Sequence, residues 1–177
     1  DMTLQTIEGD STFVKELLTD GKCDIAFLRS ESSSVKEFNS IPYMIDYLTA
    51  VLPATHPLAK ADNLPFEQLR GETFLLFPEH SFINDLCIRE CRNAGFEPHI
   101  AYTGNRGATL IDLVRNGAGI TLMMHHSARQ ENDSSLAFIP VTPGIYSYIS
   151  LNYAKEKPLS PQAEIFVRYV KAHKRDF

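Results

Sequence analysis

The segment Tyr47–Ala59, Tyr-Leu-Thr-Ala-Val-Leu-Pro-Ala-Thr-His-Pro-Leu-Ala, decides how the chain is divided. Its first half is an apolar run rich in β-formers, which predicts a strand. Its second half contains Pro53 and Pro57, which cannot donate to a strand ladder and which hold the preceding residues in extended conformations. We therefore expect a strand that leaves one lobe, enters a second lobe and ends in a rigid turn.

The composition is that of an ordinary globular protein. The chain has 177 residues, of which 44% are hydrophobic and 22% charged, enough for one domain or two small ones. The net charge of −5 argues against nucleic-acid binding by this chain's own surface. No apolar run is long enough to span a membrane, and no signal peptide opens the sequence. The three cysteines form no disulfide framework, which favours a reducing compartment and a cytoplasmic location.

Apolar runs alternate with helical stripes along the chain, which predicts an α/β fold. Strands are expected at residues 2–8, 23–28, 73–77, 99–102, 120–124, 136–141 and 146–153. Helices are expected after Ser11 and over residues 62–69, 82–94, 108–116 and from 161 onward. The first two strands and the helix between them read as one β–α–β unit, which implies parallel pairing.

Helix starts are predicted from capping residues. Ser11 is expected to cap the first helix, and Ser160 to cap the last one with Pro161 at its first position. Four apolar side chains of the last helix are expected to face the core: Ile165, Phe166, Tyr169 and Val170.

No catalytic or metal motif is present. The sequence lacks a phosphate-binding loop, a zinc-protease motif and a nucleophile elbow, so we expect neither an enzyme nor a cofactor. Cys87 and Cys91 share a helix face, and two small core residues are favoured over a redox or metal pair. His125 and His126 have no partner at ligand spacing, so no metal site is expected there.

Three strands end in a polar segment that opens a helix: Gly9–Ser11, Pro78–Ser81 and Thr103–Arg106. In open parallel sheets such segments gather where small ligands bind. Free N–H groups at helix starts favour anions, and Arg106 is suited to pair with one. The alternatives are that these segments only cap helices and that Arg106 is a solvated surface residue.

The chain resembles the effector-binding domain of LysR-type transcriptional regulators. Five motifs carry the resemblance, in the expected order over nearly the whole chain: Gly21–Phe27 (Gly-Lys-Cys-Asp-Ile-Ala-Phe), Leu52–Ala59 (Leu-Pro-Ala-Thr-His-Pro-Leu-Ala), Gly95–Pro98 (Gly-Phe-Glu-Pro), Val114–Ile120 (Val-Arg-Asn-Gly-Ala-Gly-Ile) and Leu159–Pro161 (Leu-Ser-Pro).

The resemblance implies a type 2 periplasmic-binding-protein-like fold, with two α/β lobes joined by two crossover strands. Lobe I is expected at residues 1–47 and 140–177, lacking its first strand and helix, and lobe II at residues 48–139. The second crossover would be Phe138–Thr142. The expected hinge residues are Leu52, Pro53 and Pro140. The winged helix-turn-helix that binds DNA in this family is absent from this chain.

The implied function is ligand sensing, in which a small anionic effector in the cleft controls DNA binding by a dimer or tetramer. A membrane partner is not expected, and DNA is contacted only through the absent amino-terminal domain. The expected ligand-binding residues are Ser11, Ser30, Pro78, His80, Ser81, Thr103, Gly104, Asn105 and Arg106. The alternative is a solute-binding protein of a transport system with the same fold; an enzyme on a related two-lobed fold is disfavoured.

Overall fold

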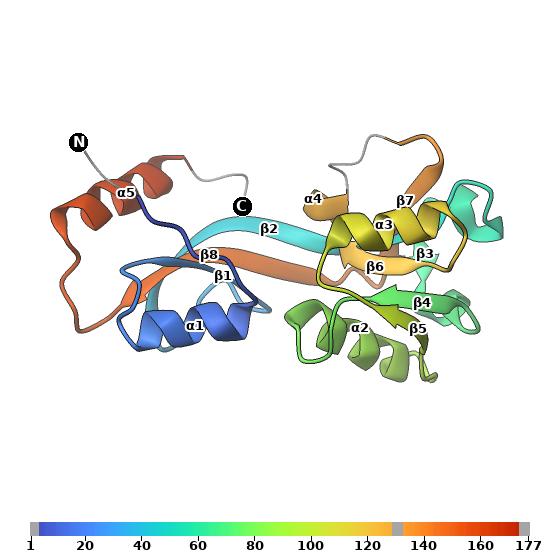
Figure 1. Cartoon of the computed structure of the whole chain (residues 1–177), viewed down its shortest axis with the longest axis horizontal. Helices are drawn as coiled ribbons and strands as arrows, with labels where there is room; N and C mark the ends of the chain where they lie inside the picture. The colour runs from blue at the N-terminus through green and yellow to red at the C-terminus, as the bar shows by residue number, and fades with distance from the viewer. Residues whose placement is uncertain (1–3, 129–132, 174–177) are drawn as a thin grey trace. The chain divides into compact units, whose positions relative to one another are not determined.

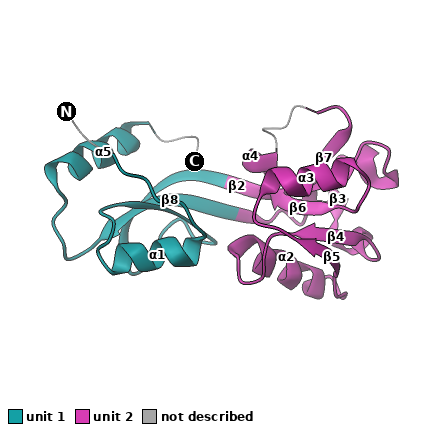
Figure 2. Cartoon of the chain, in the orientation of Figure 1, with its two compact units in different colours: residues 1–45, 147–177 teal, residues 46–146 magenta. Residues whose placement is uncertain are grey.

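The structure is a computed structural model that describes residues 4–128 and 133–173. Helices and strands alternate along the chain, which confirms the predicted α/β class (Figure 1). The chain divides into two compact units, residues 1–45 with 147–177 (unit 1) and residues 46–146 (unit 2) (Figure 2). Within the described ranges, no helix is long and apolar enough to cross a membrane.

Unit 1 is an antiparallel sheet with two helices. Its elements are α1 (Ser11–Thr19), β1 (Ala26–Ser30), the first part of β2 (Phe38–Pro53), most of β8 (Tyr146–Ala154) and α5 (Pro161–Ala172). β1 pairs antiparallel with β8, which in turn neighbours β2. No described strand pairs with the other edge of β1, so one side of this strand is open.

The predicted first strand and its parallel pairing are wrong. Residues 4–10 form neither helix nor strand, and residues 2 and 3 of the predicted strand lie outside the described residues. A strand needs a hydrogen-bonding neighbour. Residues 4–8 were expected to pair with β1, but the one described strand that pairs with β1 is β8. The alternation of apolar and polar residues was therefore insufficient to form a strand here.

The predicted start of α5 is confirmed, but its predicted inward face is partly wrong. The Oγ atom of Ser160 accepts from the N–H of Ala163 at 3.2 Å, and Pro161 is the first helical residue. Val170 is buried as expected, whereas Ile165 and Tyr169 are 55% and 60% exposed. The buried face is instead formed by Ala163, Val167 and Val170, which recur at helical spacing.

Unit 1 carries further exposed apolar side chains outside α5. The larger ones are Leu4, Ile7, Phe13 and Phe27. Single exposed apolar residues are normal on a protein surface, but here they accompany an open strand edge. Unit 1 is therefore incompletely covered.

Unit 2 is built around the second part of β2. This strand pairs antiparallel with β6 (Thr121–Met124) and with β7 (Leu136–Thr142), and β3 (Leu64–Pro65) runs parallel to β7. β4 (Thr73–Leu76) and β5 (His99–Thr103) form a parallel pair. The helical elements are η1 (Pro57–Lys60), η2 (Phe66–Leu69), α2 (Phe82–Asn93), α3 (Gly107–Arg115) and α4 (His125–Ala128).

The predicted helix over residues 62–69 is replaced by β3 and the short 3-10 helix η2. Leu64 and Pro65 pair with Val141 and Thr142, so these residues join the sheet before the helical turn begins at Phe66. Pairing with β7 therefore overrides the local preference for a helix.

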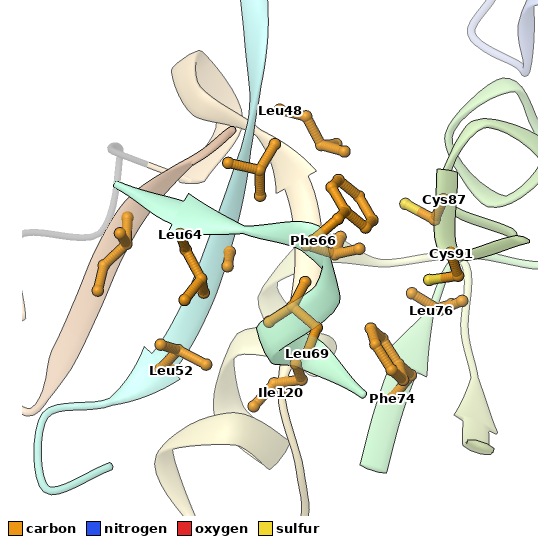
Figure 3. Packing of buried hydrophobic residues seen from close by; sticks show 14 of the residues in the cluster. Leu48, Leu52, Leu64, Phe66, Leu69, Phe74, Leu76, Cys87, Cys91 and Ile120 are labelled. Carbon is orange, nitrogen blue, oxygen red and sulfur yellow. The ribbon is translucent and has the colours of Figure 1, made fainter. Parts of the chain in front are cut away.

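The core of unit 2 consists of two clusters of buried apolar side chains, with partly buried ones packed against each. Figure 3 shows Phe66, Phe74 and Leu76 close to the sulfur atoms of Cys87 and Cys91. Burial of an aromatic or aliphatic side chain of this kind contributes about 1.5–3 kcal/mol. Cys87 and Cys91 are free thiols at 0% exposure, which supports the interpretation as small core residues.

One close backbone approach fixes how β6 joins the β4–β5 pair. The N–H of Ile120 donates to the Thr73 carbonyl, and the N–H of Leu75 donates to the Ile120 carbonyl, both at 2.8 Å. A Cβ atom on Gly119 would lie 2.4 Å from the Thr73 carbonyl oxygen. Only glycine permits this approach, so the Gly117–Gly119 motif has a structural role.

The units change at positions that differ from the predicted ones. The chain passes between the units at Ile45–Asp46, inside β2, and at Tyr146–Ser147, inside β8. β7, which includes the predicted second crossover Phe138–Thr142, lies wholly in unit 2. The predicted hinge residues also lie in unit 2, where β2 and β7 pair: Leu52, Pro53 and Pro140.

Candidate functional site

Most of the predicted ligand-binding residues meet at the carboxyl ends of β4 and β5 in unit 2. Leu76 lies opposite Thr103, so the two parallel strands end at the same level. The N–H of Gly104 continues the pairing by donating to the Leu76 carbonyl at 3.0 Å. The segments that follow the two strands therefore start side by side. The predicted residues near these strand ends are Pro78, His80, Ser81, Thr103, Gly104, Asn105 and Arg106.

A cavity of about 450 Å³ lies against α2 and β5. Its volume is within the range of small-molecule sites, about 300–1,000 Å³. Two predicted residues, His80 and Thr103, line it. Glu79 lies in the predicted segment Pro78–Ser81 but was not among the predicted residues, and the other lining residues were missed: Asn84, Asp85, Ile88, Ile100, Ala101 and Tyr102.

The segment before α2 is a hydrogen-bonded cap. The Oγ atom of Ser81 donates to the Pro78 carbonyl at 2.7 Å and accepts from the Asn84 N–H at 3.3 Å. His80 has φ of 65°, a left-handed conformation that histidine adopts more readily than bulky or branched residues. Ser81 therefore caps the helix, as the more modest interpretation of this segment held.

Asn84 connects this cap to the end of β4. Its side chain is 1% exposed, and its Nδ2 group donates to the Phe77 carbonyl at 2.8 Å. Its Oδ1 atom is buried without a hydrogen-bond partner among the described residues. Asn84 stands inside a helix and belongs to no motif, so only the structure reveals its position beside the cavity.

The start of α3 differs from that of α2. Arg106 occupies the N-cap position, and no side chain caps the first turn. Arg106 is exposed, and no carboxylate in the described part of the chain forms an ion pair with it. A cation at the positive end of a helix dipole is unfavourable by itself. Unfilled N–H groups beside an arginine form a site that favours an anion.

The two predicted residues in unit 1 have local roles. Asp10, not Ser11, caps α1: its Oδ1 atom accepts from the N–H groups of Thr12 and Phe13 at 2.9 and 3.0 Å. Asp10 occupies the N-cap position and its carboxylate accepts two N–H groups, whereas Ser11 is already the first helical residue. Ser30 ends β1, and its Oγ atom donates to the Ser32 carbonyl at 2.7 Å.

The histidine pair lies in α4 and is engaged in packing. The ring of His125 stacks on Tyr47 with centroids 4.4 Å apart, and its Nδ1 atom lies 3.3 Å from Thr49 Oγ1. The N–H of His126 donates to the fully buried carboxylate of Asp46 at 3.1 Å. Across residues 4–128 and 133–173, no group of three His, Cys, Asp or Glu residues is placed to hold a metal ion.

The buried cysteines are chemically inert positions. Burial, followed by the charges of Glu97 and Glu90, raises the pKa of Cys91 to about 12. Burial also raises the pKa of Cys87 well above its ordinary value, with smaller contributions from Cys91 and Glu90. The thiolate is the reactive form, so burial disfavours reaction at either sulfur.

The chain belongs to the family described as LysR substrate binding domain. The family's pattern matches residues 1–175 of the 177. This match confirms the resemblance that the five sequence motifs indicated, and it identifies the chain as an effector-binding domain of LysR-type regulators.

Relatives and solved structures agree with this assignment. The transcriptional dual regulator GltC of Bacillus subtilis is 26% identical over 164 residues, which cover 92% of this chain and 55% of GltC. The CcmR regulatory domain of Synechocystis, solved with 2-PG, has a TM-score of 0.84 at 16% identity, covering 94% of this chain and 81% of that one. The effector-binding domain of QuiR, solved with shikimate, has a TM-score of 0.75 at 18% identity, covering 94% and 78%.

These likenesses confirm the type 2 periplasmic-binding-protein-like fold. At such identities the solved structures show the fold alone. The chain spans about half the length of the curated relatives that it matches, 55% of GltC and 57% of the B. subtilis regulator YwbI.

Proposed function

We propose that this chain is the ligand-sensing domain of a bacterial transcriptional regulator and that it binds a small anionic effector beside the start of α3. The observation that carries the anion class is the uncapped first turn of α3 with Arg106 at its N-cap. Thr103 and Gly104 precede this turn, and Asn105 adds a side-chain amide. Together these groups offer N–H, O–H and guanidinium donors to a carboxylate or phosphate.

The neighbouring structures support the effector role. The CcmR domain was solved with 2-PG and the QuiR domain with shikimate, and shikimate is a carboxylate. We propose that the ligand of this chain is of the same general size. We also propose Ser11 and Ser30 of unit 1, which the family resemblance places among the ligand-binding positions, as contacts of the effector.

The regulatory output belongs to the whole protein. We propose that it is a cytoplasmic dimer or tetramer that contacts DNA through a winged helix-turn-helix outside this chain. We propose that effector binding is transmitted along the strands β2 and β8, in which the chain changes unit. The family membership and the regulator relatives favour this role over a transport solute-binding protein.

A thermal-shift screen with matched ligands tests the anion site. Small carboxylates, starting with shikimate, are compared with their neutral methyl esters on this chain. We expect stabilisation by at least one carboxylate and no stabilisation by its ester. Arg106→Gln is expected to weaken that carboxylate about tenfold or more, because it removes a charge-assisted contact. Thr103→Val is expected to weaken it as well.

The control is Arg168→Gln, which removes the same charge from an exposed position on α5 in unit 1. It is expected to leave carboxylate binding unchanged. Equal stabilisation by the ester, or equal weakening in both arginine variants, would contradict a specific anion site at α3.

A further inference from the structure

We propose that the cavity against α2 and β5 binds the ammonium group of a small organic amine with an apolar body. This inference goes beyond the anion site at α3: it rests on Glu79, Asn84 and Asp85, although Thr103 lies beside both places. Its basis is a cavity of unit 2 whose lining includes two carboxylates and one buried amide.

Two carboxylates line this cavity without a cation to balance them. Glu79 follows the end of β4, and Asp85 lies in the first turn of α2. Neither carboxylate forms an ion pair with any described residue. Both side chains are exposed toward solvent, so a ligand reaches them without unfolding the protein.

Asn84 also lines the cavity and carries a buried acceptor without a partner in the described part of the chain. Its Nδ2 group is engaged by the Phe77 carbonyl at 2.8 Å, which fixes the orientation of the side-chain amide. Its Oδ1 atom is left without a partner among the described residues, although Asn84 is only 1% exposed. A buried acceptor without a donor costs free energy, and a ligand N–H group placed there relieves that cost.

The remaining walls define the rest of the ligand. Ile88, Ile100 and Ala101 give the cavity an apolar side, and Tyr102 lies at its edge at 40% exposure. An alkyl or cycloalkyl body packs against such a surface, while a hydrated inorganic ion does not. The cavity volume of about 450 Å³ accommodates a ring of six carbons with its substituent.

A metal ion is a poorer occupant than an organic amine. Glu79, His80 and Asp85 all line the cavity. In the described parts of the chain, however, no three His, Cys, Asp or Glu side chains lie close enough together to hold one metal ion. A primary ammonium has three donors on one atom, which suits two carboxylates and one amide oxygen at separate positions.

The test uses three probes with the same body: cyclohexylammonium, cyclohexanol and cyclohexanecarboxylate. Each is titrated into the ¹⁵N-labelled chain at pH 7, and amide shifts are followed over residues 79–88 and 100–103. We expect cyclohexylammonium to shift these amides with an affinity at least about tenfold higher than the other two probes. We also expect binding to weaken as salt rises, since the contact is between charges.

Two variants and two controls localise the contact. Asp85→Asn and Glu79→Gln are each expected to weaken cyclohexylammonium by about fivefold or more, whereas Asp85→Glu keeps the charge and retains binding. Glu67→Gln removes an exposed carboxylate from the first turn of η2, which does not line the cavity, and is expected to have no effect. Preserved amide dispersion in each variant shows that the fold is intact.

Each other outcome overturns the proposal in a distinct way. Equal binding of cyclohexanol would show an apolar pocket without an ammonium site. Preferred binding of cyclohexanecarboxylate would show that the cavity belongs to the anion site. Equal weakening by Glu67→Gln would show only general attraction to an acidic protein, and absence of any shift at millimolar probe would exclude the site. None of these results depends on Arg106, so the anion site stands or falls separately.

Discussion

Unit 2 buries its apolar side chains, while unit 1 leaves several of comparable size in solvent. In unit 2, Phe74 and Leu76 are enclosed at 0% and 1% exposure by residues from strands and helices on several sides. In unit 1, Phe27 and Ile165 remain 42% and 55% exposed although they belong to a strand and a helix of the expected type. An apolar pattern therefore produces a core only where a second element covers it.

The largest difference between the units is expected in the free energy of unfolding that is lost when an apolar side chain is truncated to alanine. Phe74→Ala removes a fully buried ring that stacks on Phe96 at 6.4 Å between centroids. We expect a loss of about 3–5 kcal/mol in the free energy of unfolding, from lost transfer energy and a residual cavity. Urea unfolding followed by circular dichroism measures it.

The matched control is Ile165→Ala in unit 1. Because Ile165 is mostly exposed, its truncation is expected to change the free energy of unfolding by no more than about 0.5 kcal/mol. A loss comparable to that of Phe74→Ala would show that Ile165 is buried in solution and that the contrast between the units is incorrect.

The next effect concerns the cysteines, which are distributed over both units. Cys23 of unit 1 is half-buried, and burial and then the charge of Asp24 raise its pKa. Cys87 and Cys91 of unit 2 are buried with pKa values raised further, to about 12 for Cys91. At pH 8 we expect a maleimide to label Cys23 at least about tenfold faster than either core cysteine.

Peptide mass spectrometry after timed labelling measures these rates, and labelling in 8 M urea is the reference. In urea the three cysteines are expected to react at similar rates, since burial no longer separates them. Fast native labelling of Cys87 or Cys91 would mean that unit 2 opens often and is less closed than its packing indicates.

The smallest change in stability is expected from charging the exposed face of α5. Ile165→Lys combined with Tyr169→Lys is expected to alter the free energy of unfolding by about 0.5 kcal/mol or less, while lowering self-association. Sedimentation velocity across a concentration series measures the association. An unchanged association would remove this helix face as a contact, and Val167→Ala on the buried face is the control expected to destabilise.

The sequence predicted most of unit 2 because its signals are local. Gly95 and Gly117 end helices with positive φ, and the strands that follow are short apolar runs between turn residues. The errors in unit 1 are of another kind. Residues 4–8 alternate correctly but have no neighbouring strand, and the face of α5 is set by what lies beneath it rather than by its own stripe.

The candidate site, like the fold, was predicted in part. The strand ends carrying His80 and Thr103 were found because parallel strands place their carboxyl ends together. Asn84 and Asp85 were missed, since a polar residue inside a helix gives no sign of whether it faces solvent or a cavity. The buried Asp46, in the strand β2, was missed for a different reason: it accepts a hydrogen bond from His126 of α4, eighty residues later.

No described strand pairs with the outer edge of β1, so we expect the stability of unit 1 to depend on protein concentration. Unpaired N–H and C=O groups along a strand accept a strand from another chain, so two copies can extend one ladder. Association that occurs only in the folded state stabilises that state by mass action. The midpoint of unfolding of unit 1 is therefore expected to rise with protein concentration, while that of unit 2 stays constant.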